Sequence, residues 1–160
     1  MQFFVNLRVN MGQEIERKFL VREPQKAFAQ AFKSERIEQG YLSPRPEATV
    51  RLRIRGDRAW ITVKSPNHGA TRGEWEYPIP VEDAREMMPL CQGIIIDKTR
   101  HLIDYEGHTW EVDEFHSPHA GLVTAEVELK SADERVELPD WLGEEVTGDP
   151  RYYNSNLSKG

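Results

Sequence analysis

The sequence predicts an α+β fold: a closed antiparallel β-barrel of eight strands, with a charged lumen and a few flanking helices. Two observations lead to this prediction. Several short segments alternate charged and apolar residues with a period of two, the spacing that puts alternate side chains on opposite faces of a strand. A few other segments carry apolar residues at helical spacing. Many consecutive strands whose edges need protection favour closure of the sheet into a barrel.

The strand pattern recurs along the chain, with an imperfect first case in which Arg17 stands among apolar positions. Strands are predicted over residues 13–21, 48–56, 59–65, 73–80, 94–103, 108–115 and 124–130. The "RGDR" between the second and third of these segments is typical of a tight hairpin turn. Helices are predicted over 24–32 and 81–90, and a short one over 151–157, after Asp149-Pro150.

Composition bounds the class of protein. The chain has 160 residues, 38% hydrophobic and 30% charged, which indicates a single globular domain. Its formal net charge of -6 argues against a general nucleic-acid partner, which selects a basic footprint. A single cysteine, Cys91, excludes an internal disulfide and a cysteine-based zinc site, and fits a reduced, cytoplasmic location. We expect no membrane partner, because the longest apolar run is Ile94-Ile95-Ile96.

The opening residues are set apart from the rest. "MQFFVNLRVN" is too short and too polar for a signal peptide, and a second methionine, Met11, directly precedes "GQEIERKFLV". We therefore treat residues 1–11 as an N-terminal extension without assigned function, and residues 12–160 as the domain.

Like charges repeat at i and i+2 in several of the predicted strands. The acidic pairs are Glu14/Glu16, Glu74/Glu76, Glu111/Asp113 and Glu126/Glu128, and the basic pairs are Arg51/Arg53 and Lys98/Arg100, with Lys18 and Lys64 as single cations. For any one pair taken alone, the solvated face of an antiparallel sheet is the preferred explanation. The whole set favours another explanation, because adjacent like charges repel unless a counter-charge lies between them.

If the charged face points into the barrel, the interior holds water and ions instead of a packed apolar core. Carboxylates are oxygen ligands suited to Mg²⁺ or Mn²⁺. Arginine and lysine suit phosphate oxygens, which arginine can bind with two parallel hydrogen bonds. One lumen with both sets of side chains is suited to a complex of a divalent metal with a polyphosphate.

The ordered motifs resemble the CYTH superfamily, also called triphosphate tunnel metalloenzymes. "EIERKFLV" matches the family's ExExK signature, and the likeness continues through "RLRIR", "WITVKS", "RGEWEYPI", "DKTRHLI", "WEVDEF", "AEVELK" and "GEEVTGDPRYYNSNL". ExExK alone is a weak pattern, whereas the ordered series is specific and covers about residues 12–157. The short chain looks most like bacterial inorganic triphosphatases of this superfamily.

The resemblance implies a role for each charged position. Metal ligands would be Glu14, Glu16, Glu126 and Glu128, with Asp113 as a less certain addition. Phosphate-binding bases would be Lys18, Arg51, Arg53, Lys64, Lys98 and Arg100. Glu74, Glu76 and Glu111 would face the lumen without a defined role. The residues expected to take part in catalysis are Glu16, Lys64 and Tyr41.

What activates the attacking water is left open between a metal ion and Tyr41. A nearby cation such as Lys64 would depress the tyrosine pKa and make it a better base. The alternative is that Tyr41 is a half-buried aromatic residue on a strand.

The expected activity is metal-dependent hydrolysis of inorganic tripolyphosphate to pyrophosphate and phosphate. A nucleoside or thiamine triphosphatase is the near alternative, because these substrates share the triphosphate. A class IV-type adenylate cyclase would need a base and sugar pocket, to which no segment can be assigned. A polyphosphate- or nucleotide-binding module without turnover is the alternative that is not an enzyme. The oligomeric state is left open, a homodimer included.

Overall fold

The computed structural model describes residues 12–160, so the predicted extension of residues 1–11 lies outside the described part. The strands are β1 (Glu14–Val21), β2 (Lys33–Ser43), β3 (Thr49–Arg55), β4 (Arg58–Lys64), β5 (Thr71–Arg72), β6 (Glu74–Ile79), β7 (Gln92–Tyr105), β8 (His108–Phe115), β9 (Val123–Glu128) and β10 (Leu142–Glu145). The helices are α1 (Pro24–Ala29), α2 (Val81–Met87), α3 (Asn154–Leu157) and the short 3-10 helices η2 (Met88–Leu90) and η3 (Pro150–Tyr152). All three predicted helical regions and all seven predicted strand segments contain such an element.

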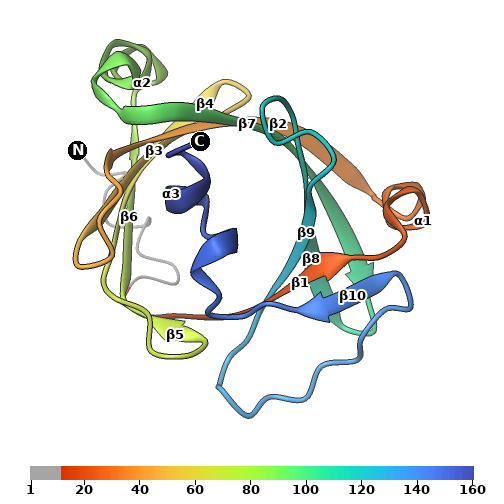
Figure 1. The fold of residues 1–160 in the computed structure, drawn as a ribbon. Coiled ribbons are helices and arrows are strands. Elements are labelled where there is room, and N and C mark those ends of the chain that lie inside the picture. Colours follow the sequence, from red (N-terminus) through yellow and green to blue (C-terminus); the bar gives the residue numbers. More distant parts are fainter. Residues whose placement is uncertain (1–11) are drawn as a thin grey trace.

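The strands form one strongly curled, antiparallel sheet (Figure 1). Its order is β10-β1-β9-β8-β7-β2-β3-β4-β6, and the two-residue β5 pairs with β1. Over residues 12–160 the sheet therefore has ten strands, so the prediction of eight is wrong in number. Of the strands outside the seven predicted segments, β2 has 11 residues, β5 has 2 and β10 has 4.

The predicted closure is seen only in part. The ladder that ends at β6 does not continue as a strand pair into β1 or β10. The two sides approach through β5, where Glu14 lies opposite Arg72 and Ile15 opposite Thr71. In addition, the Gly12 amide donates to the Glu74 carbonyl at 2.7 Å. The sheet is thus a curled half-barrel whose edges come together at a few backbone contacts.

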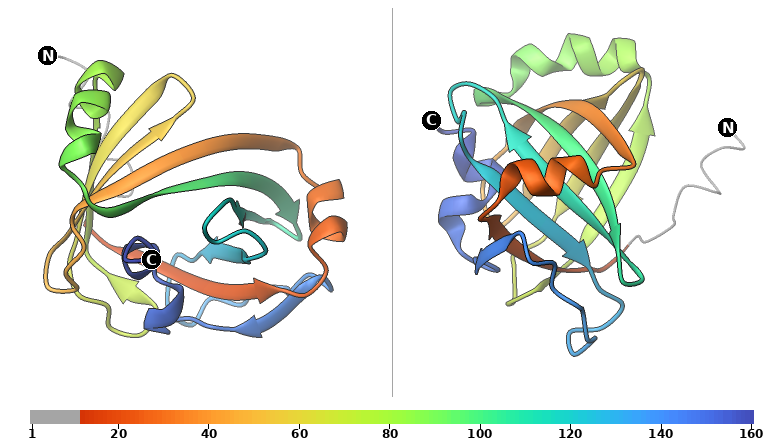
Figure 2. Two further views of the ribbon diagram at one scale, coloured as in Figure 1. Left: turned by 45° about the horizontal axis from the view of Figure 1, so that its top comes forward. Right: turned by 90° about the vertical axis from the view of Figure 1, so that its right-hand side faces the viewer.

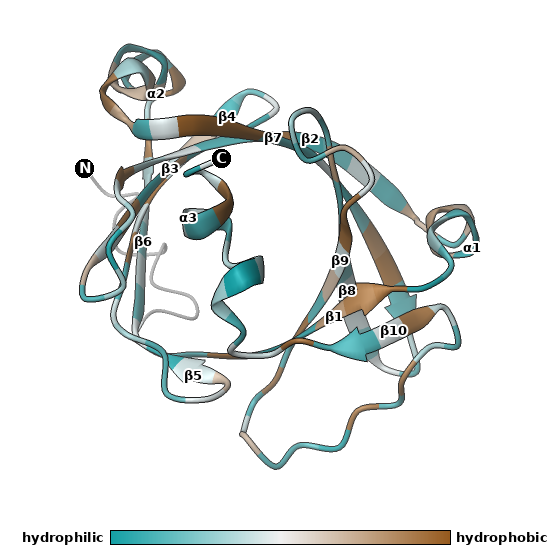
Figure 3. Ribbon diagram, viewed as in Figure 1, coloured by the Kyte–Doolittle hydropathy of each residue, from teal (hydrophilic) through white to brown (hydrophobic). Residues whose placement is uncertain are grey.

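The helices take two positions relative to the curl. α1 and α2 lie outside it, whereas the segment with η3 and α3 lies within the ring of strands (Figures 1 and 2). Under α1 the outward face carries the main apolar core, in which Trp110 packs against Phe19 and Trp141 with ring centroids 5.7 and 6.0 Å apart. Figure 3 shows hydrophilic and hydrophobic residues following one another along single strands.

No helix of the described residues combines the length and apolar character required to cross a membrane.

Candidate active site

Strand register brings the predicted charged positions together on the inward face of one wall. Glu16 on β1 lies opposite Glu128 on β9, and Lys18 lies opposite Glu126. Glu126 in turn lies opposite Glu111 on β8. One strand further, Asp113 lies opposite Arg100 on β7. Because each register pairs same-face residues, the i, i+2 repeats seen in the sequence become neighbours across strands.

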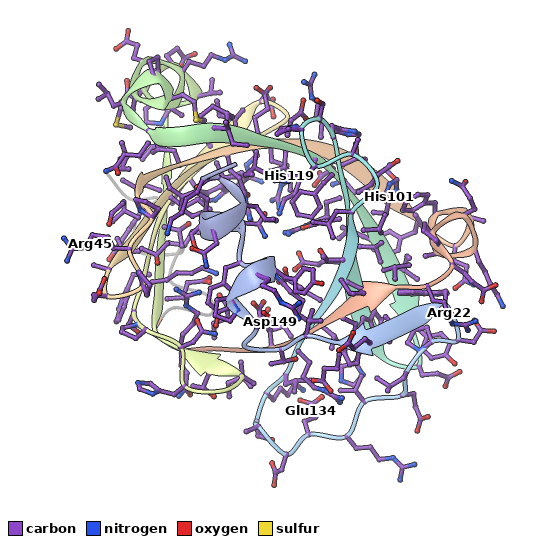
Figure 4. The ribbon with its side chains drawn as sticks, in the orientation of Figure 1. Arg22, Arg45, His101, His119, Glu134 and Asp149 are labelled. Carbon is purple, nitrogen blue, oxygen red and sulfur yellow. The ribbon has the colours of Figure 1, made fainter. Side chains whose placement is uncertain are left out.

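The facing wall is built from β2, β3, β4 and β6. Tyr41 lies opposite Arg51, which lies opposite Thr62, which lies opposite Glu76. Lys64 lies opposite Glu74 at the end of the same strand pair. In Figure 4 side chains from these strands and from the first wall extend into the ring.

Two cavities lie between the walls, with volumes of about 80 and 240 Å³. The two cavities adjoin, because they share six lining residues: Glu16, Arg51, Arg53, Lys64, Arg100 and Glu126. All six were predicted as site residues from the sequence.

The smaller, cation-rich cavity is lined by seven basic side chains against two carboxylates, Glu16 and Glu126. The seven are Lys18, Arg51, Arg53, Lys64, Arg72, Lys98 and Arg100. The larger, acid-rich cavity has five basic side chains and seven carboxylates: Glu14, Glu16, Glu74, Glu76, Glu111, Glu126 and Glu128. The two cavities therefore differ in charge: one suits an anion and the other a cation, and they meet at the shared residues.

Asp113 differs from the other predicted ligands, because it lines neither cavity. Its Oδ1 accepts from Arg100 Nε at 2.8 Å, and its Oδ2 accepts from Arg100 Nη2 at 2.9 Å. Lys98 Nζ lies 2.7 Å from the same Oδ2. Burial opposes its ionisation, but Arg100 and Lys98 hold the pKa of this carboxyl far below its usual range. Asp113 is thus a buried counter-charge beneath two phosphate-binding candidates.

The two bases that contact Asp113, Lys98 and Arg100, have pKa values shifted in opposite directions. Burial, helped by the nearby Arg100 and Arg53, lowers the pKa of Lys98 to about 7 against the attraction of Asp113. Burial also opposes the charge of Arg100, but Asp113 and Glu111 keep its pKa well above the ordinary value. Arg53 has no carboxylate within salt-bridge distance in the described chain, and burial with Arg51 and Arg100 lowers its pKa to about 9. The unpaired charge of Arg53 in that part of the chain favours an incoming anion.

The bases on the facing wall are tied to carboxylates of the acid-rich cavity. Lys64 Nζ lies 3.0 Å from Glu14 and 3.2 Å from Glu74. Arg51 Nη2 lies 3.2 Å from Glu76, whose Oε2 also accepts from the Thr62 hydroxyl at 2.8 Å. Glu14, Glu74 and Glu76 therefore orient phosphate-binding candidates in this structure.

Glu16, Glu126 and Glu128 lie on the paired strands β1 and β9, and burial disfavours the charge of each. Burial raises the pKa of Glu16 well above its usual range, and the neighbouring Glu126 and Glu14 raise it further. Glu126 is also penalised by burial, but Lys18, at 3.3 Å, and other cations hold its pKa well below the usual value. Burial, Glu14 and Glu111 raise the pKa of Glu128. A bound cation would relieve this repulsion.

A preformed metal shell is not seen. Within residues 12–160, no three His, Cys, Asp or Glu side chains are arranged to hold a metal ion. Glu16, Glu126 and Glu128 fit a divalent ion in their donor chemistry and charge, and they lie on paired strands.

The reason given for Tyr41 as a base is wrong in direction. Burial raises the pKa of its hydroxyl, and the opposing cations, chiefly Arg51 and Arg53, do not reverse that shift. Its oxygen accepts from Gln39 Nε2 at 3.3 Å. Tyr41 lines the cation-rich cavity as a neutral phenol.

Several polar residues of the site were missed by sequence reasoning: Gln39, Thr62, Arg72 and Asn154. Gln39 and Thr62 are fully buried on the inward face, Arg72 belongs to the short β5, and Asn154 begins α3. Thr62 stands two residues before Lys64 in the same predicted strand, and so shares its face, which was a usable signal. Uncharged Gln39 and Asn154 carried no such signal, because only the fold brings them to the cavity.

The C-terminal segment is held in the ring by hydrogen bonds to the strands and to one loop. Lys18 Nζ donates to the Tyr152 carbonyl at 3.0 Å, and the Ile94 amide donates to the Ser158 carbonyl at 2.7 Å. His119, labelled in Figure 4 on the loop after β8, contacts the Leu157 carbonyl at 2.8 Å. This segment forms one boundary of the cation-rich cavity.

Known proteins share this sequence and architecture. A relative described as an inorganic triphosphatase, from Acetivibrio thermocellus, is 45% identical over 150 residues, which cover 93% of this chain and 95% of that protein. Another inorganic triphosphatase, from Nitrosomonas europaea, is 36% identical over 149 residues, or 91% of this chain and 96% of that protein. The crystal structure of the inorganic triphosphatase NE1496 superposes with a TM-score of 0.63 at 33% identity, over 92% of this chain and 98% of that one. The family model of the CYTH domain matches residues 12–157, and the chain therefore belongs to the CYTH domain family.

Proposed function

We propose that this protein hydrolyses inorganic tripolyphosphate to pyrophosphate and phosphate with the help of a divalent metal. The observation that carries the proposal is the cation-rich cavity, whose seven basic side chains face only two carboxylates. A cavity of about 80 Å³ with that charge suits a compact polyanion much better than a neutral ligand. Two relatives above 35% identity that are described as inorganic triphosphatases support the same activity.

Mg²⁺ or Mn²⁺ is the metal we infer, held by Glu16, Glu126 and Glu128 with Glu14 close by on β1. When bound, the metal supplies positive charge that stabilises the phosphate oxygens in the transition state. Asp113 is assigned a different part, because its carboxylate is already engaged by Arg100 and Lys98. It holds these two side chains in place for the phosphates.

The chain's own residues then position and neutralise the substrate. Lys98 and Lys18 line only the cation-rich cavity, where they would bind the part of the triphosphate that leaves. Glu16, Lys64, Arg53 and Arg100 line both cavities, and so lie where the reacting phosphoryl group must be. Phosphoryl transfer depends mainly on such positioning and charge, so no protein nucleophile is required. Tyr41 is not assigned the role of base, because burial raises the pKa of its hydroxyl.

The half-barrel acts as a closed tunnel in this proposal. The β1–β5 pairing and the Gly12–Glu74 contact support it, since they lie where the two sides of the sheet meet. A closed wall would exclude bulk water and strengthen every charge interaction inside.

Phosphate release from tripolyphosphate, ATP and thiamine triphosphate, with Mg²⁺ and Mn²⁺ in parallel, tests the proposal. We expect metal-dependent release from tripolyphosphate. Cyclic AMP formed from ATP, with tripolyphosphate untouched, would show a cyclase instead. Binding without turnover in every arm would show a binding module.

A matched pair of variants links any activity to the cavity. Arg53→Ala removes a cation of the shared lining and Arg45→Ala removes an exposed one, so both change the charge equally. Loss of a charged hydrogen bond to phosphate costs about 1.5–3 kcal/mol. We therefore expect kcat/KM to fall by about 10- to 150-fold in Arg53→Ala and to stay near wild type in Arg45→Ala. Equal effects of the two changes would exclude the cavity as the site.

A further inference from the structure

The C-terminal helix α3 begins at Asn154, whose side chain enters a hydrogen-bond network with the phosphate-binding candidates. Asn154 Oδ1 lies 3.0 Å from Lys98 Nζ and 3.0 Å from Gln39 Nε2. Gln39 is fully buried and its Oε1 lies 2.9 Å from Arg53 Nε. One uncharged residue from the end of the chain thus contacts the network of two predicted phosphate-binding cations.

The chemistry of these groups fixes the direction of every hydrogen bond. A guanidinium has only donors, so the Gln39 atom facing Arg53 must be its oxygen. The Gln39 amide nitrogen then faces Asn154, and it donates. An ammonium also has only donors, so Lys98 makes the same demand. Two donors converge on one atom of Asn154, which must therefore be its carbonyl oxygen.

The other end of the Asn154 amide is consequently a donor. Nδ2 has no hydrogen-bond partner among residues 12–160, and Asn154 lines the cation-rich cavity. We propose that Asn154 is a substrate-binding residue whose Nδ2 donates to a phosphate oxygen in this cavity, with Lys98, Gln39 and Arg53 holding the amide in that orientation. The proposal rests on the proposed function, because it takes a triphosphate as the ligand.

This assignment gives the C-terminal segment a part in binding. Asn154 belongs to α3, which lies inside the ring but is not part of the sheet. The cation-rich cavity is therefore complete only when α3 lies in the ring. The two hydrogen bonds at 3.0 Å couple the position of α3 to the position of Lys98 and Gln39.

Asn154→Asp is the sharpest test. The substitution keeps the shape and the acceptor that Lys98 and Gln39 require, but it replaces the free donor by an acceptor and adds a negative charge. We expect the KM for tripolyphosphate to rise by about tenfold or more, with kcat changed much less, because a donor to phosphate becomes a repelling oxygen. Asn156→Asp is the control, because it adds the same charge two residues along the helix, at a side chain that donates to the Pro150 carbonyl outside the cavity.

A measurement on the unchanged protein keeps the proposal testable if Asn154→Asp does not fold. The side-chain NH₂ signals of Asn154, assigned by their loss in Asn154→Ala, are followed by NMR while tripolyphosphate is added without divalent metal. We expect them to shift at saturation, while the Asn156 signals stay in place. Unshifted Asn154 signals at saturation, or an Asn154→Asp variant that folds with wild-type KM, would overturn the inference. Failure of the wild type to bind or hydrolyse tripolyphosphate would instead overturn the proposed function.

Discussion

Replacing Asp113 by asparagine separates a buried counter-charge from a metal ligand. Asp113 is 1% exposed, and its two oxygens take hydrogen bonds from Arg100 at 2.8 and 2.9 Å and an ion pair from Lys98 at 2.7 Å. Asparagine has nearly the same shape, but its amide nitrogen is a donor and would face the donor groups of Arg100 or Lys98. Arg100 and Lys98 would lose their full counter-charge while they remain buried.

The expected cost follows from these contacts. Removing one partner of a buried ion pair costs about 3–5 kcal/mol, because an uncompensated charge stays behind. The lower end applies here, since the asparagine oxygen can still accept from Arg100. For a chain of this length each kcal/mol lowers Tm by about 2–4 °C, so we expect a Tm about 6–12 °C below wild type.

Thermal unfolding and metal titration together decide the outcome. Asp113→Asn is compared with Asp57→Asn, which makes the same charge change at an exposed hairpin turn. We expect the Tm loss in Asp113→Asn alone, partly recovered by tripolyphosphate, with Mg²⁺ affinity close to wild type in both variants. A wild-type Tm together with a large loss of Mg²⁺ affinity would refute the reasoning and make Asp113 a ligand.

Three further predictions concern Glu16, Lys98 and Thr62. Glu16→Gln should lower Mn²⁺ affinity by about tenfold or more in calorimetric titration. It should also raise the Tm of the metal-free protein at pH 7, because burial and the neighbouring Glu126 and Glu14 disfavour the charge of Glu16. A lower Tm with unchanged Mn²⁺ affinity would contradict this prediction. Lys98 has a pKa of about 7, so it is charged below that pH and neutral above it. Metal-free binding of tripolyphosphate should therefore weaken as pH rises from about 6 to about 9, whereas Lys98→Arg should lose much of that dependence because arginine stays charged. Thr62→Val should raise KM by about two- to tenfold in steady-state kinetics, since the hydroxyl links Arg51 to Glu76; a wild-type KM would show that Arg51 needs no such support.

The inward face of the sheet could be predicted because a strand has a period of two. Once the alternation was recognised, the pairs on β1, β3, β7 and β9 had to share a face, and the structure places them there. The individual partnerships could not be predicted. Which acid meets which base depends on register between distant strands, and so the engagement of Asp113 by Arg100 appears only in three dimensions.

Parts of the fold were hidden for physical reasons. β2 was not among the predicted strands. In β2 the buried Ile37 and Tyr41 face inward, whereas Arg36 lies on the outside and pairs with Asp97. That distribution does not give an apolar face opposite a polar one. The ten-stranded count and the incomplete closure depend on β5 and β10, which are too short to show a pattern.

Diffraction from crystals grown with Mn²⁺ and tripolyphosphate tests the central claim most directly, because the anomalous signal of manganese locates the metal independently. We predict a manganese peak beside the carboxylates of Glu16 and Glu126, and phosphate density against Arg53 and Lys98 in the cation-rich cavity. Tripolyphosphate bound on the outer surface, with no anion between the two walls, would contradict the account.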